Sequence, residues 1–179
     1  MITHTITLEL SPEGCAQAIK ELEAFKQRIA TGAETLAMNL AKRGEDVAKK
    51  QLATLHPAEP PFTIPDPDSV EFSVNTITEG SSKKYQLLAS SEVGNLDVLF
   101  LEFGTGVHFN GPAHQSPHPQ GKEFNYLIGE HGQGFGQNDF WYYDGGKSQG
   151  NEAVMFMQAA ADMLEDMKIV MEEADKAFR

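Results

Sequence analysis

Apolar residues recur every three or four positions at both ends of the chain, and this spacing constrains the fold more than any other feature. Ser11-Pro12-Glu13 combines a hydroxyl cap, a proline and an acid, which together favour a helix start. An apolar stripe follows at helical spacing: Cys15, Ile19, Leu22, Phe25 and Ile29. Thr31 and Glu34 have capping-box spacing, and they precede a second stripe: Leu36, Leu40, Val47, Leu52 and Leu55. The pattern predicts two N-terminal amphipathic helices, or one long helix broken near Gly32.

The segment 152–178 carries another stripe with the same spacing: Ala153, Phe156, Ala160, Met163, Met167, Val170, Ala174 and Phe178. We therefore predict one C-terminal helix over these residues. Methionines are frequent in it, and methionine suits surfaces that pack against more than one neighbour.

Alternation of apolar and polar residues indicates three strands. Residues 2–10 alternate and predict a half-buried strand, and residues 70–74 alternate in the same way. Residues 85–91 follow the turn at 79–82, so the second and third strands predict a β-hairpin. Residues 96–103 are densely apolar without a clear period, which fits either a buried strand or a short buried helix.

Two segments are rich in residues that disfavour regular structure. Residues 57–68 hold five prolines, which indicate an extended loop, and residues 107–150 form an insertion rich in glycine and polar side chains. Loops of this length often contact a neighbouring molecule. We predict one α+β domain over residues 1–179, with N-terminal amphipathic helices and a C-terminal helix packed on a small antiparallel sheet, joined by long glycine- and proline-rich loops.

The charge of the chain excludes some classes of partner. The formal net charge is −12, and residues 57–151 hold twelve acids against four lysines. An acidic surface repels phosphate, so we expect no sequence-specific nucleic-acid binding, and DNA at most passes through an acidic lumen. No apolar run approaches the ~20 residues of a spanning helix and no export leader is recognised, so no membrane contact is expected. The single cysteine, Cys15, fits a reducing cytoplasm.

Candidate metal ligands are concentrated in the insertion: His108, His114, His118 and His131, with Asp139 and Asp144. Prolines around His114 and His118 exclude a helix that would present both on one face, and no cysteine completes a zinc set. Cys15 lies in a first helical turn, which can activate a thiol, but its place on the apolar stripe favours a small buried thiol. We predict no catalytic residue, no metal and no cofactor, with a metal-dependent hydrolase that uses the loop histidines as the alternative.

Two further features of the insertion have structural and functional interpretations. The glycine-rich residues 131–137 lack the lysine and hydroxyl of a phosphate-binding loop, so we interpret them as an irregular hairpin tip. The aromatic block 140–143 is interpreted as an anchor that holds the insertion to the core. A carbohydrate-binding module that uses Trp141 and Tyr143 is a second alternative.

The segment Leu101-Glu102-Phe103-Gly104-Thr105-Gly106 resembles the "VEFGTG" signature of the tail-completion or neck proteins of long-tailed bacteriophages, the lambdoid-type head–tail joining family. The preceding order of elements is similar, and residues 151–160 resemble the family's entry into its C-terminal helix. The usual proline of that entry is absent, and the insertion 107–150 is longer. Gly104 and Gly106 allow a sharp reversal of the chain. Phe103 is expected to be buried, so the neighbouring Glu102 needs a hydrogen-bond partner or contact with water.

This resemblance implies a non-enzymatic structural subunit of the virion neck, made in the cytoplasm of a bacterial host. Copies would assemble into a ring that links the head connector to the tail, with the head-connector and tail-terminator proteins as neighbours. Heterologous contacts repeated around an axis close into such a ring. The loops, the aromatic block and the start of the C-terminal helix supply the candidate interface residues: Pro60, Pro61, Phe62, Trp141, Tyr142, Met155 and Phe156.

Overall fold

The computed structural model describes residues 5–6, 11–55, 67–80, 82–92, 94–104, 110–111, 114–115, 118–120, 134–137, 140–143, 146–148 and 151–179. Most of the predicted N-terminal strand and of the proline-rich loop lies outside these ranges. Thr5 and Ile6 belong to neither a helix nor a strand, and Pro67–Ser69 forms a short 3-10 helix, η1.

Helix α1 (Pro12–Leu52) is one unbroken helix of 41 residues, about 60 Å long at ~1.5 Å per residue. Its start is as predicted, because the Ser11 side chain accepts a hydrogen bond from the Gly14 N–H at 3.0 Å. The predicted break near Gly32 is wrong. A glycine inside a helix destabilises it by only about 1 kcal/mol relative to alanine. Gly32 is buried under the ring of Phe178, which occupies the space that a Cβ at this position would need.

Strands β1 (Val70–Glu79) and β2 (Ser82–Ser91) form the predicted antiparallel hairpin. The register pairs Val70 with Ser91 and Glu79 with Ser82, and Gly80 in the turn has φ 62°, which glycine adopts without strain. Lys83 forms an ion pair with Glu34 at 2.7 Å, between the outer half of the hairpin and α1.

Helix α2 (Asn95–Phe103) shows that the densely apolar segment is a short buried helix and not a strand. Its residues Val98 and Leu101 enter the core at the C-terminal end of α1. The other buried members of this core come from α1, from α3 and from the residues before α3: Ala48, Leu52, Val154, Phe156 and Ala160. The ring of Phe72 in β1 meets the Phe156 ring edge-on, with 5.6 Å between centroids.

The C-terminal segment contains two helices, α3 (Phe156–Glu165) and α4 (Met167–Ala177), so the prediction of a single helix from residue 152 is wrong. Residues 151–155 are not helical, and Met155 has φ 54°. Asp166 separates the helices, because its backbone is extended and its side chain accepts from the Lys168 N–H at 2.9 Å. Aspartate favours such local bonds over a continuous helix.

The insertion 107–150 was predicted to be mostly irregular, but most of its described residues form short antiparallel strands, and residues 118–120 form a bend and turn. Strands β3 (Asn110–Gly111) and β4 (His114–Gln115) pair with each other. Strands β5 (Gly134–Gln137), β6 (Phe140–Tyr143) and β7 (Gly146–Ser148) form a sheet in that order. Residues 134–137 of the predicted hairpin tip and the aromatic block 140–143 are therefore neighbouring strands.

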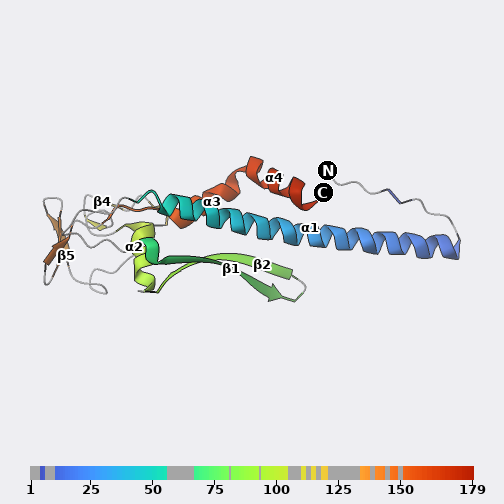
Figure 1. Cartoon of the computed structure of the whole chain (residues 1–179), viewed down its shortest axis with the longest axis horizontal. Helices are drawn as coiled ribbons and strands as arrows, with labels where there is room; N and C mark the ends of the chain where they lie inside the picture. The colour runs from blue at the N-terminus through green and yellow to red at the C-terminus, as the bar shows by residue number, and fades with distance from the viewer. Residues whose placement is uncertain are drawn as a thin grey trace.

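Helix α1 is the axis of the molecule (Figure 1). The β1–β2 hairpin runs along one side of it, α3 and α4 lie on the other, and α2 crosses near its C-terminal end. The fold class is α+β, as predicted. Among the described helices, none combines the length and apolar character that crossing a bilayer would require.

The ion pairs between α4 and α1 should make the stability of the protein depend on pH. Glu173 accepts from Lys176 Nζ at 2.7 Å and from Arg43 Nη1 at 2.9 Å, which together hold the pKa of its carboxyl below the ordinary value. A lowered folded-state pKa stabilises the protein above the unfolded-state pKa, and this stabilisation is lost as the pH falls through the folded-state pKa. Glu173→Gln should therefore unfold more easily at pH 7, and its difference from the parent should shrink in acid. Chemical denaturation across this pH range measures the difference, with Asp175→Asn at an exposed position of the same helix as the control.

Candidate functional site

The described part of the signature, residues 101–104, forms the end of α2 and is buried. Leu101 is 0% exposed, Phe103 3% and Glu102 4%. Gly104 follows with φ 81°, and a Cβ there would lie 2.9 Å from both the Ala153 nitrogen and the Asn151 oxygen. Only glycine combines this conformation with such a close backbone approach. Thr105 and Gly106 lie outside the described residues, so their role in the reversal stays a prediction.

Glu102 places its carboxylate at the start of α3. Its Oε2 accepts from the Met157 N–H at 2.8 Å, and its Oε1 accepts from the Gln158 N–H at 2.8 Å. These are free N–H groups of the first helical turn, where a negative charge also interacts favourably with the helix dipole. Met155 at the N-cap position offers no side-chain cap. Glu102 therefore supplies the cap that the local sequence of α3 lacks.

His118 is the second partner of Glu102. Its Nε2 lies 3.0 Å from Glu102 Oε1, and its Nδ1 accepts from the Gln120 N–H at 3.0 Å. Because Nδ1 is an acceptor, the ring proton is assigned to Nε2, which donates it to the carboxylate. The His118 ring is 5% exposed and packs on Phe103, with 4.1 Å between ring centroids.

The segment before α3 binds the C-terminal end of α2. The Val154 and Met155 N–H groups donate to the carbonyls of Leu101 and Glu102 at 2.8 and 3.2 Å. The Asn151 amide donates to the Phe100 carbonyl at 2.9 Å. The Leu101 and Glu102 carbonyls, which the last turn of α2 leaves without helical partners, thus accept from this segment, and the Phe100 carbonyl accepts from it in addition to the Gly104 N–H. The end of one helix and the start of another are joined by backbone contacts around one buried carboxylate.

These contacts join parts of the chain that are distant in the sequence. The Glu102 carboxylate accepts from the Met157 and Gln158 N–H groups of α3, and its Oε1 also accepts from His118 Nε2, which belongs to the insertion. Among the residues that the structure describes, no three histidine, cysteine or acidic side chains gather closely enough to hold a metal ion. Of the candidate metal ligands considered in the sequence, only the His118 side chain is described. The side chains of His108, His114, His131, Asp139 and Asp144 lie outside the described residues.

Cys15 is exposed on α1, so the prediction of a buried thiol is wrong. The stripe to which it belongs lies at the N-terminal end of α1, away from the core at the other end (Figure 1). Periodicity identified the stripe correctly but could not tell whether another element covers it.

The predicted interface residues have mixed outcomes. Phe156 is 0% exposed and belongs to the core, so an interface role for it is wrong. Met155 is half-buried beside the Glu102 site. Trp141 and Tyr142 lie in β6, but their side chains are outside the described residues, as are Pro60, Pro61 and Phe62. For these five residues the interface assignment stays a prediction.

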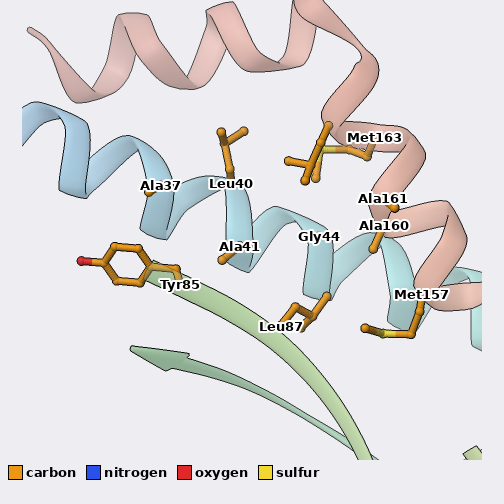
Figure 2. A pocket seen from close by; sticks show the side chains of 11 residues that line it. Ala37, Leu40, Ala41, Gly44, Tyr85, Leu87, Met157, Ala160, Ala161 and Met163 are labelled. Carbon is orange, nitrogen blue, oxygen red and sulfur yellow. The ribbon is translucent and has the colours of Figure 1, made fainter. Parts of the chain in front are cut away.

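A groove lies between α1, β2 and α3 (Figure 2), with a cavity volume of about 380 Å³. Small residues of α1 leave the space, and larger side chains of the other two elements border it: Ala37, Ala41 and Gly44 with Tyr85, Met157 and Leu164. The lining is almost wholly apolar. The spacing of small residues along α1 does not by itself indicate that they leave a groove.

Comparison of the chain with models of protein families, with characterised proteins and with solved structures finds no match.

Because the Glu102 carboxylate accepts several hydrogen bonds, we expect that a nearly isosteric substitution there lowers the free energy of unfolding. Glu102→Gln keeps the shape but loses the charge and one acceptor oxygen, so a buried N–H at the start of α3 loses its partner. Charged hydrogen bonds of this kind are worth about 1.5–3 kcal/mol, and we expect a loss of that order in the free energy of unfolding. Urea denaturation measures it, with exposed Glu152→Gln as the neighbouring control. Equal stability of the two variants would contradict the assigned role.

Gly104→Ala and Gly80→Ala form a matched pair. Both glycines have positive φ, but Gly104, with φ 81° and ψ 170°, lies in a region that essentially only glycine adopts, and an alanine there meets a backbone cost of about 1–3 kcal/mol. At Gly80 the new Cβ meets nothing within 4 Å, whereas at Gly104 it presses on two backbone atoms. Thermal or urea unfolding should show that Gly104→Ala is the more destabilising. If the two variants lose the same stability, the close approach of residues 151–153 contributes nothing.

Proposed function

We propose that the chain is a non-enzymatic structural subunit that assembles into a ring at the head–tail junction of a long-tailed bacteriophage. The ring would join the head connector to the tail, with the head-connector and tail-terminator proteins as its neighbours. The protein would be made in the bacterial cytoplasm and end in the neck of the virion.

The observation that carries this proposal is the amount of large apolar surface that the folded chain leaves exposed. Five such side chains are more than half exposed: Ile19, Leu22, Leu164, Met167 and Met171. They lie on α1, α3 and α4 and not on one loop. Contiguous apolar surface on a folded protein usually marks a contact with another protein. An elongated subunit whose core occupies only one end of α1 leaves much of its surface available for such contacts.

The structure of the signature also supports a role in assembly over a role in catalysis. The six-residue signature is the feature on which the resemblance to the neck-protein family rests. In this chain its Glu102 carboxylate caps α3, and its Gly104 allows close backbone contact. The chemistry of these residues is used for holding two helices together. The net charge of −12 fits a wall past which DNA slides without binding.

Disrupting the gene in the phage or prophage genome that encodes this chain should give separate filled heads and tails, visible by electron microscopy. Supplying the protein from a plasmid should restore joined particles, because the missing contact would be structural. A plasmid that carries exposed-site Glu152→Gln is the matched control and should restore joining equally. Normal joined particles after disruption would refute the proposal.

A further inference from the structure

Two apolar surfaces of this chain lie on different halves of the same helix. The first is the stripe on residues 12–30 of α1, which we call the arm and which extends beyond both the hairpin and α4 (Figure 1). On the arm, Ile19 is 56% exposed and Leu22 55% exposed. The second is the groove between α1, β2 and α3 (Figure 2). Its lining includes Leu164, which is 51% exposed.

The arm cannot fill the groove of its own chain. The groove is built partly on Ala37, Ala41 and Gly44, which belong to the same unbroken helix as the arm. Leu22 and Ala41 are nineteen residues apart, which on a continuous helix is about 28 Å. A straight helix does not fold back on itself, so an arm that enters this groove comes from another molecule.

The charges beside the two surfaces are complementary. The C-terminal half of the arm stripe is flanked on its two sides by exposed Lys26 and Arg28. The α3 side of the groove ends in exposed acids: Asp162, Glu165 and Asp166. Opposite charges around an apolar contact fix its orientation and disfavour wrong partners. The arm residues 12–30 are neutral overall, so they do not add to the repulsion between two copies of an acidic chain.

We propose that the arm of one copy packs its apolar stripe into the groove of a second copy, so that every subunit both gives an arm and receives one. The contact is heterologous, because two different surfaces meet, and repetition of such a contact closes a ring or extends a filament. This contact would be the one that joins the subunits of the proposed ring, so its biological purpose rests on the proposed function. The arm and the groove themselves follow from the structure.

Disulfide trapping tests the contact directly, since the native chain has one cysteine. In a Cys15→Ser background, Leu22→Cys labels the arm and Leu164→Cys labels the groove, both at exposed sites. Mixing the two single-label variants under mild oxidation should give disulfide-linked dimers that contain one copy of each, and the doubly labelled chain should give a ladder of oligomers. Mass spectrometry identifies the linked peptides.

Two results would overturn the proposal. If Leu22→Cys alone links mainly to itself, the arms pair with each other as a two-fold dimer. If the mixture gives no arm-to-groove disulfide at protein concentrations where the parent self-associates, some other surface forms the contact.

Charge substitutions give an independent measurement by sedimentation equilibrium. Leu22→Asp and Leu164→Asp should each weaken self-association by at least about tenfold, because each replaces an apolar side chain of the proposed contact with a charge. Met171→Asp is the control, since it is equally exposed but does not line the groove, and it should leave association unchanged. Circular dichroism checks that all three fold. Equal weakening by the control would overturn the proposal.

Arm-to-groove disulfides together with normal particles after gene disruption would refute the neck role and leave the self-contact standing.

Discussion

The buried Glu102 carboxylate is the interaction on which the rest of the structure depends. A carboxylate is costly to remove from water unless donors replace the water, and here two backbone N–H groups and His118 do so. These donors belong to α3 and to the insertion, while Glu102 belongs to α2. One side chain therefore fixes where α3 begins and how a loop returns to α2. The same contact orients α3, whose next two turns carry Ala160 into the core and Leu164 to the edge of the groove.

The continuity of α1 has consequences of a different kind. Because the helix does not break at Gly32, its C-terminal part is covered by the hairpin, α2 and α3, while its arm extends past them. A single rigid helix thus carries both a core-forming face and an apolar stripe that is remote from that core. The groove also lies on α1, because the small residues Ala37, Ala41 and Gly44 leave space where β2 and α3 approach the helix. Rigidity and small side chains together leave two surfaces that one molecule cannot bring into contact.

Much of the fold could be predicted from local patterns. The start of α1, the hairpin and its turn, and the α+β class followed from capping residues, alternation and glycine. The site was predictable only in part. A glutamate next to an expectedly buried Phe103 signalled a need for a partner, and Gly104 signalled a reversal. His118 as that partner could not be found, since nothing in the spacing of residues 102 and 118 brings them together.

What the sequence determined by itself is therefore local: which residues favour helix or strand, and which faces are apolar. The tertiary structure alone decided whether Gly32 breaks a helix, where the C-terminal helices begin and end, and whether Cys15 or Phe156 is covered. Those outcomes depend on small energies, such as the ~1 kcal/mol of a helical glycine, that a contact from a distant residue readily outweighs. Phe178 over Gly32 and Glu102 at the start of α3 are such contacts, and each joins positions more than fifty residues apart.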